Sequence, residues 1–156
     1  MTRVVVGGGT GRLGSLICAG VAAADDLVLA GRVARSLAGA EDGWASIGEA
    51  LAAAQADVLI DVSAPAIGEA HALAGVEAGL PVVLGTTGVE ADGMARIDAA
   101  AREAGVPVLY VPNFAITAVL MMRFAAEAAK LLPDCAIVEE HHPAKKDHPS
   151  GTARRT

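Results

Sequence analysis

The residues best suited to chemistry gather in one short segment, EEHHPAKKDHPSGT, at positions 139–152. A histidine such as His141 titrates near neutral pH and can donate a proton. Lys145, four residues later, can hold a carboxylate as a compact positive charge. The turn Ser150-Gly151-Thr152 offers backbone N–H groups of the kind that form an anion-binding nest. Together these residue types predict a site for a small anionic substrate that is protonated while it accepts a hydride.

This segment also has two plainer interpretations. A metal site is disfavoured because His141 and His142 are adjacent, and neighbouring residues on a strand point to opposite faces. The sequence also lacks a Cys-x-x-Cys or His-x-x-x-His pair, so no metal is expected. A solvated charged loop is the other interpretation, and composition alone leaves it open.

A second chemical motif opens the chain. The sequence VVVGGGTGRLG spaces Gly8, Gly11 and Gly14 three residues apart, between an apolar run and an alanine-rich segment. Glycines there allow a sharp turn and a close approach to a pyrophosphate, while the next helix presents free N–H groups. This strand–turn–helix context favours a dinucleotide site over a merely tight turn. The expected cofactor contacts in this turn are Gly8, Gly9, Thr10, Gly11, Arg12 and Leu13.

Charges near the second apolar run indicate which dinucleotide is bound. An NAD-preferring site has an acidic residue near the end of its second strand, for the ribose 2′-hydroxyl. Here Asp25 and Asp26 precede that run, whereas Arg32 and Arg35 stand at or after its end. Arginine suits a 2′-phosphate through its charge and forked donors, so NADPH is favoured over NADH. The plainer interpretation is that both arginines are solvated surface charges.

Another glycine-rich turn, Gly85-Thr86-Thr87-Gly88, follows the fourth apolar run. Open α/β sheets bind ligands at the carboxyl ends of their strands, so this turn can present hydroxyl and N–H groups to the nicotinamide ribose or to substrate. An ordinary polar turn that caps the next helix is an equally open interpretation. The sequence DVSAP, at 61–65, belongs to the same sheet edge, and Pro65 is expected simply to start a helix.

An alternation of β-branched runs and alanine-rich segments positions these motifs. Strands are expected over 3–6, 27–33, 57–63, 81–88 and 106–113, and helices over 11–24, 46–55, 66–79 and 91–105. The strands are continuously apolar, as parallel strands buried on both faces are. Right-handed crossovers then give an α/β fold, a Rossmann-type doubly wound parallel sheet with helices on both sides. Ser46 and Glu49 have the spacing of a capping box at the second helix.

The pattern changes after Asn113. A long apolar helix is expected over 115–134, stopped by Pro133, and a strand is expected to start at 135 and run into the polar segment. We therefore expect a dinucleotide-binding domain over 1–113 and the beginning of a second, α+β domain over 114–156. The roughly forty residues after the boundary are too few for an independent core.

Composition narrows the class of protein. The chain has 156 residues, of which 53% are hydrophobic but only 3% aromatic, which suits an aliphatic, alanine-rich core. A net charge of −6, with no basic run before the final segment, disfavours nucleic acid as a partner. Cys18 and Cys135 are expected to be free thiols in a reducing compartment, by default the cytoplasm. No membrane span is expected, because no uninterrupted apolar stretch reaches about 20 residues.

Taken together, the motifs resemble the 4-hydroxy-tetrahydrodipicolinate reductase family, also called the dihydrodipicolinate reductases. EEHHPAKKDHPSGTA is similar to the family signature E-x-H-H-x-x-K-x-D-x-P-S-G-T-A, and GGTGRLG, DVSAP, GTTG and VPNFAI agree with the family pattern. The resemblance covers the whole chain and is closest to the actinobacterial branch. It implies that a homotetramer reduces an unsaturated cyclic dicarboxylate with NADPH or NADH, on the route to diaminopimelate and lysine. Arg35 falls where the family has an adenosine-ribose contact.

The resemblance also implies roles within the signature. His141 is implied to be the proton donor, assisted by Lys145, which also helps to bind a carboxylate. His142 is implied to contact the substrate, while Gly151 and Thr152 hold a carboxylate through backbone and hydroxyl donors. The residues implied to line the nicotinamide side are Gly85, Thr86, Thr87, Val111, Pro112, Asn113 and Phe114.

Two features depart from the family pattern. Thr117 stands where the family usually has glycine, at the hinge into the second domain. Family members also continue well beyond position 156, so the substrate-binding and oligomerisation domain is expected to be incomplete, with apolar side chains exposed. The alternative to a reductase is therefore a module that binds NADPH without turnover. An atypical short-chain dehydrogenase or epimerase is disfavoured, because Tyr110 is followed four residues later by Phe114 and not by the lysine that such enzymes have.

Overall fold

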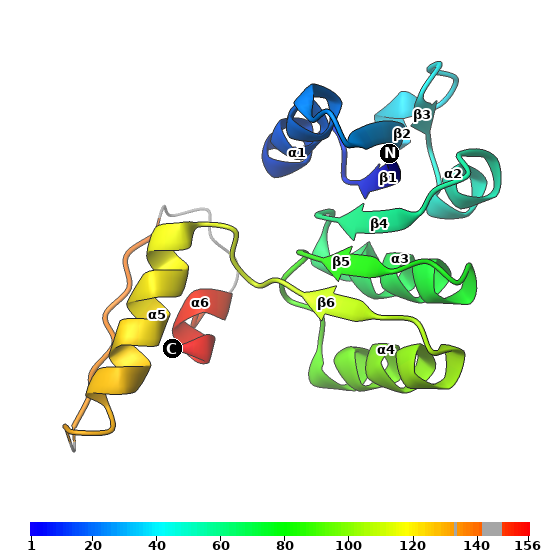
Figure 1. The fold of residues 1–156 in the computed structure, drawn as a ribbon. Coiled ribbons are helices and arrows are strands. Elements are labelled where there is room, and N and C mark those ends of the chain that lie inside the picture. The colour runs from blue at the N-terminus through cyan, green and yellow to red at the C-terminus, as the bar shows by residue number, and fades with distance from the viewer. Residues whose placement is uncertain (133, 142–147) are drawn as a thin grey trace. The chain divides into compact units, whose positions relative to one another are not determined.

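The computed structural model describes residues 1–132, 134–141 and 148–156. The chain forms two compact units, Met1–Val111 and Pro112–Thr156. Every strand of the described chain belongs to the first unit, which also contains the glycine turns singled out above (Figure 1).

A six-stranded parallel sheet forms the middle of the first unit (Figure 1). Its strands are β1 (Thr2–Gly7), β2 (Leu27–Val33), β3 (Gly43–Trp44), β4 (Val58–Asp61), β5 (Val82–Leu84) and β6 (Val108–Tyr110). In space they run in the order β3-β2-β1-β4-β5-β6, and every adjacent pair is parallel. The chain builds outward from β1 to β3 and then crosses to the other side of β1 at β4. The topological switch point therefore lies between β1 and β4.

Helices cover both faces of this sheet, which confirms the predicted fold class. The helices are α1 (Arg12–Ala23), α2 (Ile47–Ala53), α3 (Pro65–Glu77) and α4 (Ala91–Ala104). Val4 and Val6 of β1 pack with Cys18 of α1 on one face. Val5 packs on the other face, in a core to which α2, α3 and α4 contribute Ala50, Ala72, Val76 and Ile97. Successive side chains of β1 thus point to opposite faces and both sets are buried, as expected for a central parallel strand.

Local signals in the sequence set the helix ends. The hydroxyl of Ser46 caps α2 by accepting a hydrogen bond from Glu49 N at 3.3 Å. This is one of the two hydrogen bonds that define the predicted capping box. Pro65 occupies the first turn of α3, where its missing N–H costs no hydrogen bond. Gly105 ends α4 in the left-handed conformation, with φ at +65°, a position that glycine adopts without strain.

The shortest elements are absent from the sequence prediction. β3 has two residues, too few to show a hydrophobic period, and a 3₁₀ turn, η1 (Arg35–Leu37), precedes it. Gly31 of β2 makes room for this edge strand, because a Cβ there would lie 2.5 Å from the ring of Trp44. β5 and β6 are also shorter than predicted, because the glycine- and proline-containing ends of the predicted runs lie outside the strands.

The second unit contains two helices in its described part, α5 (Ile116–Ala128) and α6 (Gly151–Arg155). α5 is shorter than the predicted 115–134 helix, and Pro133 lies outside the described residues. Ser150 caps α6, where only a turn was predicted, by accepting from Ala153 N at 3.0 Å.

The strand predicted from residue 135 is wrong for the part that the structure describes. Residues 135–141 form no strand, because no strand in the described part of this unit lies beside them to take up their backbone hydrogen bonds. Each helix in the described ranges is also too short or too polar to span a membrane.

Candidate dinucleotide-binding site

Main-chain hydrogen bonds hold the glycine turn between β1 and α1. Gly8 N donates to Val33 O at 2.9 Å and Gly9 N donates to the same oxygen at 3.2 Å, which ties the turn to the end of β2. Gly11 N donates to Gly8 O at 2.9 Å and closes the turn. Gly8 has a φ of +80°, a backbone conformation that glycine adopts far more readily than other residues.

Close packing requires two glycines of the motif. A Cβ on Gly8 would lie 2.7 Å from Val62 O, just beyond the end of β4. A Cβ on Gly14 would overlap the carbonyl of Gly8, so only glycine lets the first turn of α1 sit against the turn before it. No side chain caps α1 at Gly11, which leaves the first N–H groups of the helix available to an anion. This cradle fits a dinucleotide diphosphate, because a side chain at either glycine would fill it.

A pocket of about 490 Å³ lies at the carboxyl ends of β1, β2 and β4. It coincides with the switch point of the sheet, where open α/β sheets bind their ligands. Its walls come from the glycine turn, from residues at or after the ends of β2, β3 and β4, and from α3: Gly8, Thr10, Gly11, Val33, Ala34, Arg35, Ser36, Ala45, Val62, Ser63, Ala64, Ile67 and His71.

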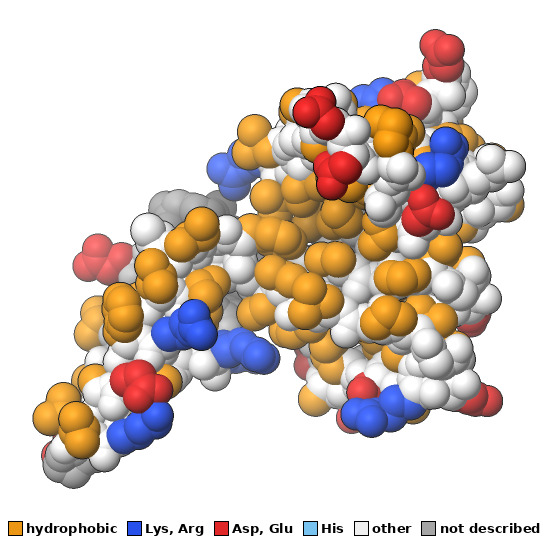
Figure 2. All heavy atoms as spheres, viewed as in Figure 1, with side chains coloured by type: hydrophobic (Ala, Val, Ile, Leu, Met, Phe, Trp, Pro, Cys, Tyr) orange, Lys and Arg blue, Asp and Glu red, His pale blue; other side chains and the backbone are white. Residues whose placement is uncertain are grey.

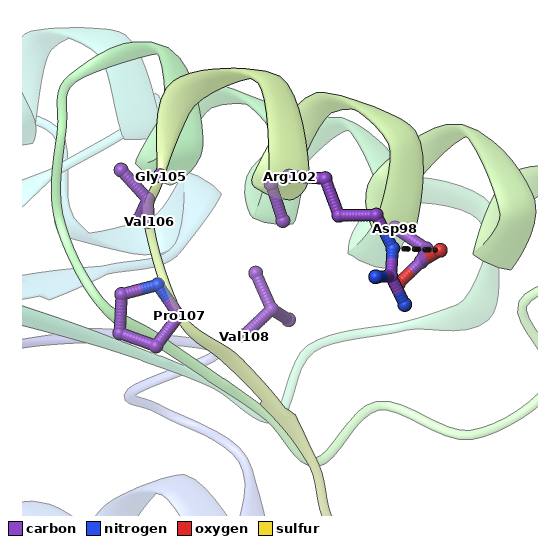
Figure 3. A pocket seen from close by; sticks show the side chains of 7 residues that line it. Asp98, Arg102, Gly105, Val106, Pro107 and Val108 are labelled. Atoms are coloured by element: carbon purple, nitrogen blue, oxygen red, sulfur yellow. Dashed lines mark hydrogen bonds and ion pairs between the residues drawn. The ribbon is translucent and has the colours of Figure 1, made fainter.

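A second hollow, of about 370 Å³, lies beside the edge strand β6 (Figure 3). It is lined by the end of α4 and by residues 105–108, which lead into the amino end of β6. The side chains of Asp98 and Arg102 pair with each other there, with Arg102 Nε 2.8 Å from Asp98 Oδ2. It has no phosphate turn and lies at the wrong end of the strands, so the pocket at the switch point is the candidate site.

The structure brings part of the predicted cofactor set to this pocket. Four of the predicted residues line it: Gly8, Thr10, Gly11 and Arg35. Three others belong to the same turn or to the first turn of α1 without lining the pocket: Gly9, Arg12 and Leu13.

The two arginines near the end of β2 have different surroundings. Arg32 makes a two-pronged ion pair with Asp42, with Nε 3.0 Å from Oδ2 and Nη2 2.5 Å from Oδ1. The hydrogen bonds from Arg32 lower the pKa of Asp42 below its usual value. Arg32 is therefore neutralised at short range, and Arg35 is the arginine of the two that lines the pocket.

The Gly85–Gly88 turn follows β5 at the same carboxyl edge of the sheet. Gly85 N and Thr86 N donate to the carbonyl oxygen of Asp61, at 2.8 and 3.1 Å. The Thr86 side chain is buried, and its hydroxyl donates to Asp61 Oδ2 at 2.5 Å. In this structure the Thr86 hydroxyl therefore holds the turn against β4. Thr87 is half-buried in the same turn.

Asp61 and His71 are functional candidates that sequence reasoning missed. Asp61, the last residue of β4, is fully buried, and its Oδ1 lies 2.7 Å from His71 Nδ1. Its Oδ2 accepts from Ser63 Oγ at 3.0 Å. His71 and Ser63 both line the pocket. The available signals were an acidic residue at the end of an apolar run and one histidine in the next helix, but their pairing depends on how α3 returns along the sheet.

In the second unit, one carboxylate joins the polar segment together. Glu139 Oε1 accepts from Ser150 N at 2.9 Å, and Glu139 Oε2 lies 3.6 Å from His141 Nδ1. His141 is therefore linked through Glu139 to the residue that caps α6. His142 and Lys145 lie outside the described residues.

The remaining predicted residues flank the boundary between the units. Val111 ends the first unit, and its N–H donates to Leu84 O at 2.8 Å. Asn113 Nδ2 donates to Thr152 Oγ1 at 3.0 Å, while Asn113 Oδ1 accepts from Ala115 N at 2.8 Å. Pro112 and Phe114 also belong to the second unit, as does Gly151, the first residue of α6.

A parallel sheet with this strand order, a phosphate turn after β1 and a pocket at the switch point define a Rossmann-type dinucleotide-binding protein. The family model described as dihydrodipicolinate reductase, N-terminus, matches residues 2–114. The corresponding model for the C-terminus matches residues 117–156. The chain belongs to the dihydrodipicolinate reductase family.

Named relatives agree with this membership. A 4-hydroxy-tetrahydrodipicolinate reductase of Beutenbergia cavernae is 43% identical over 155 residues, which are 99% of this chain and 59% of that protein. One of Bacillus cereus is 44% identical over 113 residues, or 72% of this chain and 42% of that protein. This chain therefore spans little more than half the length of the relatives it matches.

A solved structure supports the fold over almost the whole chain. The dipicolinate-bound dihydrodipicolinate reductase from Paenisporosarcina sp. TG-14 is 28% identical, with a TM-score of 0.81 over 99% of this chain and 63% of that one. The GenD2 protein of gentamicin A biosynthesis, solved in complex with NAD, is 24% identical with a TM-score of 0.65, and this likeness concerns the fold alone.

Proposed function

We propose that this protein carries out the NAD(P)H-dependent reduction of 4-hydroxy-tetrahydrodipicolinate to tetrahydrodipicolinate, in the pathway to diaminopimelate and lysine. The observation that carries the proposal is the pocket at the switch point, in a chain whose residues 2–114 and 117–156 both match this reductase family. Residues 1–113 serve as the dinucleotide-binding domain. Residues 114–156 begin a domain for substrate binding and for assembly into a tetramer.

The first unit binds the reduced dinucleotide, which supplies the hydride when bound. Gly8 to Leu13 hold the diphosphate through backbone N–H groups, because no side chain at Gly8 or Gly14 blocks their approach. Arg35 lies in the pocket wall, whereas Arg32 is engaged by Asp42. This difference supports Arg35 as the partner of a 2′-phosphate, and hence NADPH as the preferred cofactor.

The polar segment of the second unit binds the dicarboxylate and supplies the proton. His141 donates the proton, Lys145 assists it, and His142 contacts the substrate. Gly151 and Thr152 hold a carboxylate. Glu139 supports this assignment, because a carboxylate beside Nδ1 orients the ring and leaves Nε2 for the substrate. The nicotinamide side of the cofactor is lined by Gly85, Thr86, Thr87, Val111, Pro112, Asn113 and Phe114.

The test compares turnover with cofactor binding. The 156-residue chain is mixed with NADPH and freshly generated 4-hydroxy-tetrahydrodipicolinate, and loss of the reduced-nicotinamide absorbance is followed. His141→Gln should lower turnover by about 10²- to 10⁴-fold, the usual contribution of a general acid, and leave the Kd for NADPH unchanged. His148→Gln, in the same segment and without an assigned role, is the matched control.

Three results would contradict parts of the proposal. NADPH binding without any turnover would favour a module that binds the cofactor only. A parallel loss of binding and turnover in His141→Gln would make His141 a structural residue. Failure to bind either NADPH or NADH would contradict the assignment of the first unit.

A further inference from the structure

A carboxylate is buried directly beneath the phosphate turn. Asp61 is fully buried, and a Cβ on Gly7, the residue before the turn, would overlap its Oδ1. A buried negative charge at this place opposes the binding of a diphosphate unless donors compensate it. Among the described residues, its side-chain partners are Ser63 Oγ, Thr86 Oγ1 and the ring of His71.

His71 stands between this carboxylate and the pocket. Its Nδ1 lies 2.7 Å from Asp61 Oδ1, and because a carboxylate can only accept, Nδ1 carries the hydrogen. The His71 side chain keeps 12% of its surface exposed and lines the pocket, whereas Asp61 does not. With Nδ1 engaged in the interior, Nε2 is the polar atom of the ring that is left for a ligand.

The neighbours of His71 in the pocket indicate the ligand. Gly8, Thr10 and Gly11 of the phosphate turn line the same pocket, and Arg35 lines its wall after β2. This set suits a ligand with phosphate and hydroxyl groups close together. A ribose–diphosphate unit has both.

We propose that His71 binds the dinucleotide directly through Nε2, at its ribose–diphosphate portion, and that Asp61 is the positioning residue that fixes the ring. The inference rests on the proposed function of the first unit. It adds a polar contact from α3 to a site at the carboxyl ends of β1, β2 and β4, and it assigns Ser63 and Thr86 to holding Asp61.

Two substitutions separate the nitrogens of His71. The amide nitrogen of asparagine can take the place of Nδ1, so His71→Asn keeps the hydrogen bond to Asp61 but loses Nε2. The longer glutamine can take the place of Nε2. We expect His71→Asn to raise the Kd of the chain for NADPH and NADH at least about tenfold, as loss of one polar contact does. We expect His71→Gln to recover part of this loss.

The measurement is a fluorescence titration with NADPH, with the unfolding midpoint of each variant recorded in parallel. Wild-type affinity in His71→Asn would overturn the inference while leaving the proposed function intact. Absence of NADPH and NADH binding by the wild-type chain would overturn both, and that result requires no variant.

A second measurement needs no substitution and covers the case in which His71→Asn does not fold. The imidazole ¹⁵N signals of the wild-type chain are followed during addition of NADPH. The Nε2 signal of His71 should shift as the site saturates, while Nε2 of His148, in the second unit, serves as the reference. An Nε2 signal of His71 that does not move on saturation would contradict direct contact.

Discussion

The two units of the chain differ in where their apolar side chains go. All fourteen buried hydrophobic residues among the described positions lie in the first unit, between Val4 and Ile97. In the second unit α5 buries none of its residues, and Ile116 and Phe124 stay 76% and 67% exposed. Figure 2 shows hydrophobic side chains at the surface along α5. The first unit therefore stabilises its own site geometry through a core, whereas burial contributes little to α5.

The largest effect should come from a matched pair of truncations, one in each unit. Leu59 is fully buried in β4, so Leu59→Ala should lower the free energy of unfolding by about 2–5 kcal/mol. Phe124→Ala removes a larger but exposed side chain and should change the free energy of unfolding by less than about 0.5 kcal/mol. Denaturant titration of both variants measures the difference. Similar losses in the two would mean that the units do not differ in burial.

A second prediction concerns two glycines of α1 with opposite surroundings. Gly14→Ala pushes a Cβ into the carbonyl of Gly8, so it should lower the free energy of unfolding by about 1–3 kcal/mol and weaken NADPH binding strongly. A Cβ on Gly20 would meet no neighbouring element within 4 Å, so Gly20→Ala should be neutral or stabilise the helix by about 0.5–1 kcal/mol. Thermal unfolding and NADPH titration test both. A tolerated Gly14→Ala would show that α1 can move away from the turn without loss.

The features that the sequence predicts well are local ones. The spacing of Gly8, Gly11 and Gly14 reports a turn that is completed within seven residues, and Ser46 caps α2 by bonding to the N–H of the residue three positions later. The pairing of Asp61 with His71 depends on the packing of α3 against the sheet, and no spacing along the chain specifies that. The sequence also did not show that Arg32 is paired while Arg35 faces the pocket. That difference arises because the loop before β3 folds back and places Asp42 beside Arg32.

The strand wrongly predicted from residue 135 also depends on structure distant along the chain. The run CAIV has the β-branched, apolar character of a strand, but a strand also needs a neighbour for its backbone groups. In the first unit each apolar run finds such a neighbour in the sheet. In the described part of the second unit none is present, so the same composition gives irregular structure.

The third prediction asks whether cofactor choice belongs to the first unit alone. Arg35→Asp should weaken NADPH binding about tenfold more than NADH binding, because it removes a partner of the 2′-phosphate and adds a like charge. Arg123→Asp, on the exposed surface of α5, makes the same charge change in the second unit and should leave the ratio of the two Kd values unaltered. Titration of each variant with both cofactors gives the ratios. An unchanged ratio in Arg35→Asp would remove Arg35 from the cofactor site.

The smallest effect should come from the ion pairs. Arg32 lowers the pKa of Asp42, so the pair stabilises the fold at pH values above the ordinary aspartate pKa of about 3.9. The contribution is lost as the pH falls through the lower pKa of the folded state. Asp42→Asn should therefore cost about 0.2–1 kcal/mol near neutral pH, since both side chains are partly exposed, at 32% and 45%.

The control for this pair lies in the second unit. Glu127, near the end of α5, and Lys130, just beyond it, are more exposed, at 71% and 66%, so Glu127→Gln should have a smaller effect than Asp42→Asn at the same pH. Unfolding curves at neutral pH and in the acid range test both variants. The loss of unfolding free energy in Asp42→Asn should become smaller as the pH falls below about 4, because Asp42 of the wild-type chain then takes up a proton. It should also become smaller when salt is added, because salt screens exposed charges. A loss that persists unchanged in acid would mean that Asp42 acts through packing or loop geometry, and the charge of the pair would then not distinguish the two units.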